Sequence, residues 1–379
     1  MAAKKLSPFR VLMTADTLGG VWTYAIELIK ALDFYGVEVA LATMGGNLNP
    51  RQHEQVVALP NLTLYESKYQ LEWMDNPWQD IEKAGEWLLQ INQEFRPDLI
   101  HLNNFAHGNL NWGKPVVMVV HSCVGTWWQA VKGEALPPAW AQYRQVITAG
   151  LQSADLVVAP SAAMLQEAQE LYGPFKQSQV IYNGQKTDAF VYRPKEKIIF
   201  SMGRVWDEAK NIRLLAQVAA GLEWPVYIAG DARHPVTNET QLLPNVYFLG
   251  PLSKTEVIHW LSRSAIFALP AKYEPFGLAV LEAALSGCAL VVGDIPTLRE
   301  IWGQAATYVN PDDAEALEIA LNKLMDDEFI RNMMGFRAMQ QGLQYSIEQT
   351  AFHYHQAYHQ LGSETAFVQT EIKKNKIKE

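Results

Sequence analysis

The sequence predicts an α/β protein with two doubly wound, mostly parallel sheets. Three observations predict this class. Short apolar, β-branched runs alternate with longer helical patterns, the alternation restarts once near Ile198, and 379 residues suffice for two ordinary domains. Apolar residues make up 49% of the chain and charged residues 19%, so both domains have enough apolar side chains to form a core.

The first half holds the longer series of strands. Its predicted strands are Arg10–Ala15, Val37–Thr43, Leu62–Tyr65, Leu99–Leu102, Val116–His121, Leu156–Ala159 and Gln179–Tyr182. Helical patterns between them include Val21–Phe34, Trp78–Glu94 and Ala162–Tyr172. Strand–helix–strand units favour parallel pairing, because each helix carries the chain back to the edge where the previous strand began.

A turn signal at Asn183-Gly184, followed by Pro194, precedes the restart. The predicted strands of the second half are Ile198–Met202, Val226–Ala229, Val246–Leu249, Ile266–Leu269 and Ala289–Val292, and residues 312–361 are predicted as consecutive helices. We therefore predict domains at residues 1–184 and 185–345, a final helix at 346–362 and a flexible basic tail at 363–379. Two α/β domains joined by a short linker leave a cleft, which is a common ligand site.

The composition argues against several classes of protein. The formal charge is −9, with 31 basic and 40 acidic residues, whereas a nucleic-acid binder normally shows a strong basic excess. Cys123 and Cys288 are too few for a disulfide framework or a cysteine-based zinc cluster, which fits a reducing cytosol. Met1–Arg10 lacks the apolar stretch of a signal peptide, and the longest apolar runs fall short of the roughly 20 residues that span a bilayer.

The last residues contain Lys373, Lys374, Lys376 and Lys378. These lysines either form a solvated tail or dock weakly on an anionic membrane surface. We expect a cytoplasmic protein, with peripheral contact at the inner face of the membrane as the alternative.

The segment from Tyr273 to Ala284 carries the strongest chemical signal. A buried strand, Ala265–Pro270, leads into a loop, and a helix is predicted to begin near Leu278. None of the residues at Phe276, Gly277 and Leu278 is a Ser, Thr, Asp or Asn that would cap the helix, so an anion could accept hydrogen bonds from its free N–H groups.

Two glutamates flank this predicted anion site. Glu274 precedes the helix and Glu282 lies one turn inside it, while Gly277 allows a diphosphate to approach the backbone. Ionised carboxylates accept hydrogen bonds from sugar and ribose hydroxyl groups. The alternative is that Gly277 is an ordinary N-cap and both glutamates are solvated.

Two further loops follow predicted strands. Arg204 and Lys210 lie between the strand Ile198–Met202 and a helix, where both cations could stabilise a leaving diphosphate; the alternative is an ordinary surface loop. Gly19-Gly20 follows the first strand, but the G-x-G-x-x-G pattern is absent, so a dinucleotide cofactor is not predicted. His121 ends a buried strand, where it faces a ligand crevice or serves as a structural residue.

Metal ligands are missing from the expected places. The chain has no Asp-x-Asp pair, which commonly holds a metal on a nucleotide diphosphate. His355 and His359 lie four residues apart without a carboxylate between them, which argues against a zinc site. We predict neither a metal nor another cofactor.

Taken together, these segments resemble the GT-B glycosyltransferases of family 4, a large retaining group that uses nucleotide sugars. The Glu274–Glu282 segment, with its Pro-Phe-Gly insert, is highly specific for this family. The other matching segments, in the family's order over about residues 10–345, are Gly19-Gly20, His121, Val180–Gly184, Gly203-Arg204 with Lys210-Asn211, Val246–Gly250 and Asn310–Asp313.

The resemblance implies a GT-B architecture, in which two Rossmann-like domains face each other across a cleft. Residues 1–184 would bind the acceptor, residues 185–345 would bind the nucleotide sugar, and the helix at 346–362 would cross back onto the first domain. The implied catalytic residues are His121 near the donor sugar, Arg204 and Lys210 on the diphosphate, and Glu274 on the sugar hydroxyls. Further implied donor contacts are Gly19, Gly20, Pro251, Leu252, Phe276, Gly277, Leu278, Ala279 and Glu282, the last on the ribose.

The resemblance implies hexose transfer, with UDP-glucose as the favoured donor and a glycan or lipid-linked saccharide of extracellular or envelope polysaccharide synthesis as acceptor. Acceptor candidates on the first domain are Trp22, Tyr24, Asn103, Asn104, His107, Trp127 and Trp128. The alternatives are a non-catalytic nucleotide-sugar or glycan-binding protein of the same fold and a nucleotide-sugar epimerase. Arg204, Lys210 and Glu274 argue against the binding protein, and the Glu274–Glu282 segment with Lys210 argues against the epimerase.

Two departures from the family pattern are visible. Gln185-Lys186 stands where the family often has Ile-Asp, which removes the acid of a hinge hydrogen bond. The loop from Gly293 to Glu300 replaces the usual Gly-Gly-x-x-Glu, so the selection of the donor sugar is expected to differ there.

Overall fold

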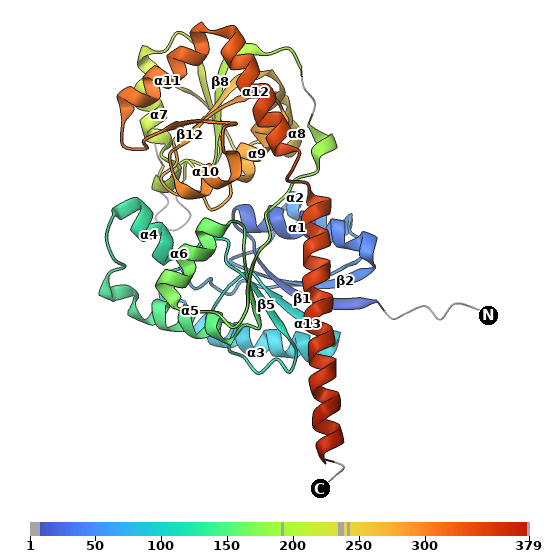
Figure 1. The fold of residues 1–379 in the computed structure, drawn as a ribbon. Coiled ribbons are helices and arrows are strands. Elements are labelled where there is room, and N and C mark those ends of the chain that lie inside the picture. Colours follow the sequence, from blue (N-terminus) through green and yellow to red (C-terminus); the bar gives the residue numbers. More distant parts are fainter. Residues whose placement is uncertain (1–7, 191–192, 234–238, 241–242, 377–379) are drawn as a thin grey trace, which may run out of the picture.

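The computed structural model describes residues 8–190, 193–233, 239–240 and 243–376, with side chains described as far as residue 363. Two all-parallel sheets form two lobes, one above the other in Figure 1. The strand order of the first sheet is β3-β2-β1-β4-β5-β6-β7, and that of the second is β10-β9-β8-β11-β12-β13. This arrangement confirms the predicted fold class.

The first lobe follows the predicted alternation closely. Its strands are β1 (Phe9–Asp16), β2 (Val37–Met44), β3 (Leu62–Glu66), β4 (Leu99–Leu102), β5 (Val116–Val119), β6 (Leu156–Ala159) and β7 (Ser178–Val180). Its α-helices are α1 (Gly20–Leu32), α2 (Pro50–Val57), α3 (Trp78–Phe95), α4 (Val124–Lys132), α5 (Ala141–Ser153) and α6 (Ala162–Tyr172), with 3-10 turns η1 (Asp33–Tyr35) and η2 (Pro138–Trp140). The strand predicted to end at His121 ends at Val119, so His121 lies in the following loop.

The second lobe contains one strand that the sequence did not predict, the three-residue β13 (Thr307–Val309) at the sheet edge. The other strands are β8 (Glu196–Met202), β9 (Val226–Ala229), β10 (Tyr247–Gly250), β11 (Ser264–Leu269) and β12 (Ala289–Gly293). The α-helices are α7 (Ile212–Val218), α8 (Lys254–Arg263), α9 (Leu278–Leu285), α10 (Pro296–Trp302), α11 (Ala314–Asp326) and α12 (Glu328–Gly342), with 3-10 turns η3 (Thr187–Ala189), η4 (Glu208–Lys210) and η5 (Ala219–Gly221).

Helices cover both faces of each sheet, which explains the unbroken apolar runs of the central strands. Every residue of β5 and of β11 is buried, as expected for strands that lie between two helical layers. Polar loops therefore gather at the ends of the strands, and the carboxyl ends of β8 and β11 lead into the loops that carry Arg204 and Glu274.

The chain passes between the lobes twice, and the two crossings touch. Gln185 N–H donates to the carbonyl oxygen of Tyr345 at 3.1 Å, and Ile347 N–H donates to that of Gln185 at 3.1 Å. A side chain at Gly184 would overlap the carbonyl group of Ser346. The predicted domain limits at 184/185 and 345/346 fall in these crossings and stay predictions.

The last helix, α13 (Ile347–Lys376), runs down the first lobe beside α1 (Figure 1). Tyr354 and Tyr358 bury their rings against that lobe. The helix is longer than the predicted 346–362 and continues through most of the expected tail. The tail lysines lie outside the residues whose side chains are described.

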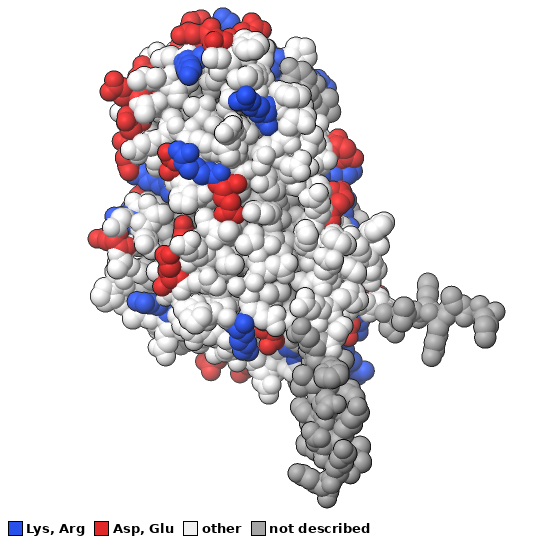
Figure 2. Space-filling model, viewed as in Figure 1, with Lys and Arg blue, Asp and Glu red and all other residues white. Residues whose placement is uncertain are grey.

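The surface charges are mixed. Figure 2 shows Lys and Arg side chains scattered among Asp and Glu over both lobes, as the near balance of the composition predicts. Within the part of the chain that the structure describes, no helix combines the length and the apolar character needed to cross a membrane.

Candidate active site

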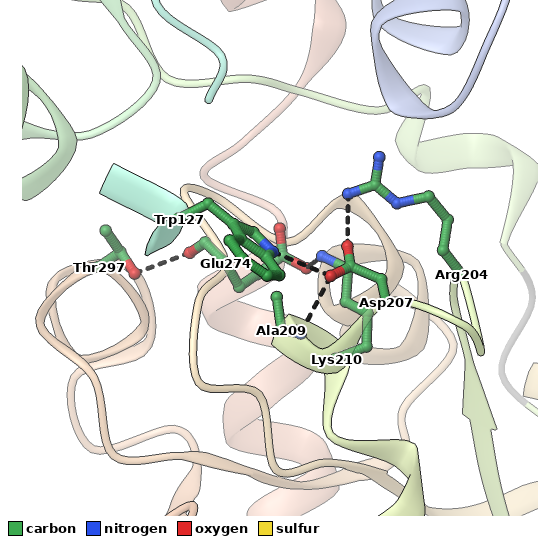
Figure 3. Close-up of polar contacts among 7 residues, drawn as sticks. All are labelled: Trp127, Arg204, Asp207, Ala209, Lys210, Glu274 and Thr297. Atoms are coloured by element: carbon green, nitrogen blue, oxygen red, sulfur yellow. Dashed lines mark hydrogen bonds and ion pairs between the residues drawn. The ribbon is translucent and has the colours of Figure 1, made fainter. Parts of the chain in front are cut away.

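A buried aspartate organises the loop after β8. Asp207 Oδ2 accepts a hydrogen bond from Arg204 Nη2 at 2.7 Å, and its Oδ1 accepts from Ala209 N–H and Trp127 Nε1–H, each at 3.0 Å (Figure 3). Trp127 belongs to α4 of the first lobe. The carboxylate therefore connects the two lobes as well as the two ends of its own loop.

The charges in this loop hold Arg204 in place and leave it partly exposed, so that it can bind an anion. Burial raises the pKa of Asp207, but the charges of Arg204 and Lys210 and the hydrogen bonds outweigh it, so the pKa lies below its ordinary value. The ionised Asp207 holds one side of the guanidinium, while 47% of the Arg204 side chain stays exposed. A Cβ on Gly19 would lie 3.4 Å from Arg204 Nη1, so this glycine lets the first lobe approach Arg204 closely.

Lys210 and Glu274 form a second ion pair beside the first. Lys210 Nζ lies 2.7 Å from Glu274 Oε2, and both side chains are 13% exposed. The Thr297 hydroxyl donates to the backbone carbonyl of Glu274 at 2.7 Å and so ties the glutamate loop to α10 (Figure 3). The structure therefore brings Arg204, Lys210 and Glu274 together, and their roles toward a ligand stay predictions.

The start of α9 lacks a side-chain cap. Gly277 occupies the N-cap position in the left-handed region, with φ +89°, and no side chain bonds the free N–H groups of the first turn. A Cβ at this position would lie 3.2 Å from Glu274 Cγ. An uncapped helix start beside the Lys210–Glu274 pair is suited to accept an anion.

Glu282 lies further along α9 in a polar cluster that the sequence did not predict. Its Oε1 accepts from Lys254 Nζ at 2.6 Å and from Gln185 Nε2 at 3.0 Å. Burial raises the pKa of this carboxyl group, and the charge of Lys254 partly offsets the rise. Gln185, which replaces the family's usual residue, thus joins the crossing between the lobes to the predicted ribose-binding carboxylate.

His121 lies in the loop that follows β5 of the first lobe, among uncharged side chains. Its Nε2 lies 2.8 Å from Asn103 Oδ1, and the ring of Tyr24 packs edge-on at 4.4 Å between centroids. Burial and the neighbouring His101 lower the pKa of His121 to about 3. The imidazole therefore stays uncharged near neutral pH.

Five of the acceptor candidates are buried, and three of them, Trp22, Tyr24 and His107, are described first. Trp22 and Tyr24 are 5% and 4% exposed and belong to α1, and Trp22 Nε1–H donates to Gln55 Oε1 at 2.8 Å. His107 is 1% exposed, and its Nε2 lies 3.0 Å from the carbonyl oxygen of Ile81. These residues were expected on loops of the first domain, where aromatic rings could contact a sugar, but here they are buried.

The other two buried candidates are Asn103 and Asn104, whereas Trp127 and Trp128 belong to α4 and are partly exposed. Asn104 Nδ2 donates to Asp16 Oδ1 at 2.9 Å, and Asp16 interacts electrostatically with Arg204. The indole N–H of Trp127 is engaged by Asp207, whereas that of Trp128 is buried without a partner among the described residues. Asn103 has its side-chain amide engaged by buried groups.

The other predicted donor contacts lie at strand and helix ends. Gly20 begins α1, whereas Phe276 is buried and packs edge-on against Tyr345. Pro251 and Leu252 follow β10, and Leu278 and Ala279 form the first turn of α9.

Sequence reasoning missed three residues at this junction. Asp207 lies three positions after Arg204 in the same loop, and that spacing was the available signal. Lys254 could not be recognised from the sequence, because it comes close to Glu282 only in the folded chain. Glu300 on α10 ends the segment that departs from the family pattern. It accepts hydrogen bonds from the N–H groups of Ala162 and Ala163 at 2.7 and 2.8 Å and so caps helix α6 of the other lobe.

The side chains at this site do not form a metal centre. Among the residues that the structure describes, no group of three or more His, Cys, Asp or Glu side chains is arranged to hold a metal ion. The carboxylates of Asp207, Glu274 and Glu282 are each paired with a Lys or Arg instead.

Two family models match the chain. Glycosyltransferase Family 4 matches residues 18–189, and Glycosyl transferases group 1 matches residues 185–341. A glycogen synthase of Mycobacterium tuberculosis is 27% identical over 262 residues, which is 63% of each chain. The match therefore spans less than two thirds of the length of this curated relative.

Solved structures share the whole fold at low identity. Sucrose-phosphate synthase from Thermosynechococcus elongatus superposes with a TM-score of 0.80 at 18% identity, covering 94% of this chain and all of the other. HepE from Anabaena, solved in complex with UDP-glucose, gives a TM-score of 0.71 at 17% identity and covers 92% of this chain and 99% of its own. Because the two family models together match residues 18–341 and the two sheets have this same fold, the chain belongs to the family 4 glycosyltransferases of the GT-B fold.

Proposed function

We propose that this protein is a retaining hexosyltransferase that moves a hexose from a nucleoside-diphosphate sugar to a saccharide or lipid-linked acceptor. One observation carries the proposal. Arg204 and Lys210 are each held by a carboxylate, and they lie beside a helix start that has no side-chain cap. Fixed positive charge at this place would stabilise a diphosphate as it leaves, because its negative charge grows in the transition state.

Glu274 supports the assignment of a sugar to the space beside this charge. Its Oε2 is bound by Lys210, whereas its Oε1 makes no hydrogen bond among the described residues. A carboxylate oxygen of this kind accepts a hydrogen bond from a sugar hydroxyl group. Lys210 would thus hold both the phosphate and the residue that orients the sugar.

Retention of configuration belongs to the same proposal. The acceptor oxygen would bond to the anomeric carbon on the face from which the diphosphate departs, and the acceptor's proton would pass to an oxygen of the leaving phosphate. This route needs stabilised phosphate charge and no protein nucleophile. It agrees with a neutral His121 and with the Lys210–Glu274 ion pair of the second lobe.

UDP-glucose is the donor that we propose to test first, because HepE, which shares the fold, was solved with this nucleotide sugar. The acceptor is a saccharide or lipid-linked saccharide of extracellular or envelope polysaccharide synthesis. Peripheral contact with the membrane is part of the proposal only if the acceptor is lipid-linked.

A panel of UDP-, GDP- and ADP-sugars tests the proposal through release of free nucleoside diphosphate and through thermal stabilisation. Turnover of one donor with an added saccharide acceptor supports it. Stabilisation without turnover would instead indicate a binding protein, and conversion of the donor sugar without transfer would indicate an epimerase.

Two glutamate variants test which part of the donor each glutamate contacts, the sugar or the ribose. Glu274→Ala should lose turnover but keep affinity for free UDP, because it removes a contact to the sugar. Glu282→Ala should weaken UDP itself, because it removes a contact to the ribose. Calorimetric titration with UDP compares the two, and an equal loss of affinity would reject this division.

A further inference from the structure

The amide of Asn103, just past the end of β4, has only one possible orientation. Its Nδ2 donates to the carbonyl oxygen of Thr14 at 2.7 Å, and its backbone N–H donates to the Thr14 hydroxyl at 3.0 Å. A backbone carbonyl can only accept, so the amino end of the amide must face Thr14. The carbonyl end, Oδ1, therefore faces the two histidines on the other side.

Both histidines present the same nitrogen to this oxygen. Nε2 of His121 lies 2.8 Å from Asn103 Oδ1, and Nε2 of His101 lies 3.3 Å from it. Since an amide oxygen only accepts, the 2.8 Å contact places the proton of His121 on Nε2. The 3.3 Å contact favours the same tautomer in His101, whose Nε2 also lies 3.5 Å from the Tyr24 hydroxyl. Burial keeps both rings neutral, with the pKa of each lowered to about 3, so each Nδ1 is left as an acceptor.

In His101, the acceptor nitrogen receives a hydrogen bond from the last helix. Nδ1 of His101 lies 2.6 Å from the hydroxyl of Tyr358 on α13, which then must donate. Nδ1 of His121 has no hydrogen-bond partner among the described residues, and this atom is not completely buried. A chain of hydrogen bonds thus leads from α13 through His101 and Asn103 to an imidazole with one acceptor free.

We propose that Asn103 is a positioning residue that fixes His121 as the Nε2–H tautomer, so that its Nδ1 accepts a hydrogen bond from a hydroxyl group of the transferred sugar. The sugar part of this inference rests on the proposed function, whereas the tautomer does not. A neutral acceptor nitrogen binds a hydroxyl and repels an unprotonated phosphate oxygen. Asn103 therefore assigns His121 to the sugar and leaves the diphosphate to Arg204 and Lys210.

The tautomer is tested on the full-length protein without substrate. Long-range 1H–15N correlations of the imidazole rings, recorded after labelling histidine with 15N, show which nitrogen carries the proton. We expect a protonated Nε2 and a bare Nδ1 in both His101 and His121 at neutral pH. A proton on Nδ1 of His121, or an equal mixture of tautomers, would overturn the inference while leaving the proposed function standing.

Kinetics test the consequence for the sugar, with the donor that the panel identifies and its monodeoxy analogues. Asn103→Leu should mix the tautomers of His121 and lower kcat by about ten- to a hundredfold, with a smaller change in KM. The wild-type protein should react about tenfold or more slowly with one analogue, and this discrimination should shrink in Asn103→Leu. A variant that mixes tautomers yet keeps full discrimination would overturn the sugar assignment.

Two further variants separate positioning from general destabilisation. Asn61 also uses its Nδ2 to bond two backbone carbonyls, those of Ile29 and Val37, but it lies in another part of the lobe. Asn61→Leu should lower the unfolding temperature without changing the tautomer of His121 or the kcat. Tyr358→Phe should disturb His101 alone and change kcat by no more than about twofold, and the tautomer measurement on the wild-type protein still tests the inference if Asn103→Leu does not fold. Equal losses of kcat in Asn61→Leu and Asn103→Leu would show a merely structural role.

Discussion

The two sides of the candidate site are held by different kinds of interaction. On the side of the second lobe, Arg204 and Lys210 each pair with a carboxylate at 2.7 Å, and Arg204 is half exposed. On the side of the first lobe, His121 is neutral and is fixed by an amide oxygen at 2.8 Å. One side supplies charge, and the other supplies orientation.

This difference teaches how a charged leaving group and an uncharged sugar can share one site. If His121 contacts the donor sugar as proposed, a cationic imidazole there would attract the diphosphate and compete for it with Arg204 and Lys210. Keeping His121 neutral avoids that competition. The proposed division of labour is therefore one of charge, and variants that remove charge on one side should differ in effect from those that disturb orientation on the other.

The largest expected effect is the loss of charge at Lys210. Lys210→Met should lower turnover by about 100- to 1,000-fold, because it removes a fixed cation at the leaving group and leaves Glu274 unpaired. Lys197→Met is the matched control, since Lys197 pairs loosely with Glu223 where both side chains are about three-quarters exposed. Steady-state rates of the two variants check the prediction, and near-normal turnover of Lys210→Met would remove the charged side from the mechanism.

The sequence could predict the charged side because its residues lie in short motifs. Arg204 and Lys210 share one loop, and Glu274 and Glu282 share another, so each motif shows its chemistry directly. The alternating strand pattern likewise predicted the sheets, because parallel strands covered on both faces leave long apolar runs. β13, a three-residue strand at the sheet edge, was missed.

The neutral side could not be predicted in this way, because its contacts join residues far apart in the chain. Tyr358 and His101 are 257 positions apart, and nothing near either residue indicates the other. Asn103 was expected to contact the acceptor from a loop of the first domain, yet the fold turns its amide toward Thr14 and the histidines. Gln185 was noticed only as a departure, and its bond to Glu282 appears only in three dimensions.

The second prediction uses the pH dependence of stability to separate the neutral side of the site from the charged side. The folded-state pKa of His101 is about 3 against an ordinary 6.5, so between these values the unfolded chain binds one proton more. Stability should therefore fall as the pH falls below about 6.5, by at most about 1.4 kcal/mol per pH unit for this histidine. Asp207 has a lowered pKa, so the stability from its ion pair is present above the unfolded value of 3.8 and is lost only at lower pH.

Urea unfolding of the wild-type protein and of His101→Gln between about pH 8 and pH 5 measures this effect. Asp16, Glu72 and Glu282 have raised pKa values and act in the opposite direction, but they are common to both proteins and cancel in the difference. The variant should lose less stability on acidification. Parallel curves would show that His101 does not stay neutral in the fold.

The third prediction concerns the contact that joins the two sides. Glu300 accepts from two N–H groups at the start of α6 and from the Tyr182 hydroxyl, across the junction of the lobes. Glu300→Ala should cost about 1 kcal/mol of stability, as for loss of a helix cap, and should lower turnover a few-fold. Glu170→Ala, at an exposed position of α6, is the control. Equal losses of stability and turnover in the two variants would contradict a joining role.

The smallest expected effect is that of a chelator. A nucleoside diphosphate that leaves must be neutralised either by a divalent cation or by fixed groups. Arg204, Lys210 and the uncapped start of α9 are fixed groups placed together, and the carboxylates around them are already paired with Arg204, Lys210 and Lys254. Turnover should therefore change by less than about twofold in excess chelator, because the proposed electrostatic stabilisation comes from the protein. Some stimulation by added Mg²⁺ would be compatible with this, since the ion binds released diphosphate and speeds its departure. A complete loss of activity in chelator, restored by one particular metal, would mean that the charged side works through an ion and that the two sides differ less than their contacts suggest.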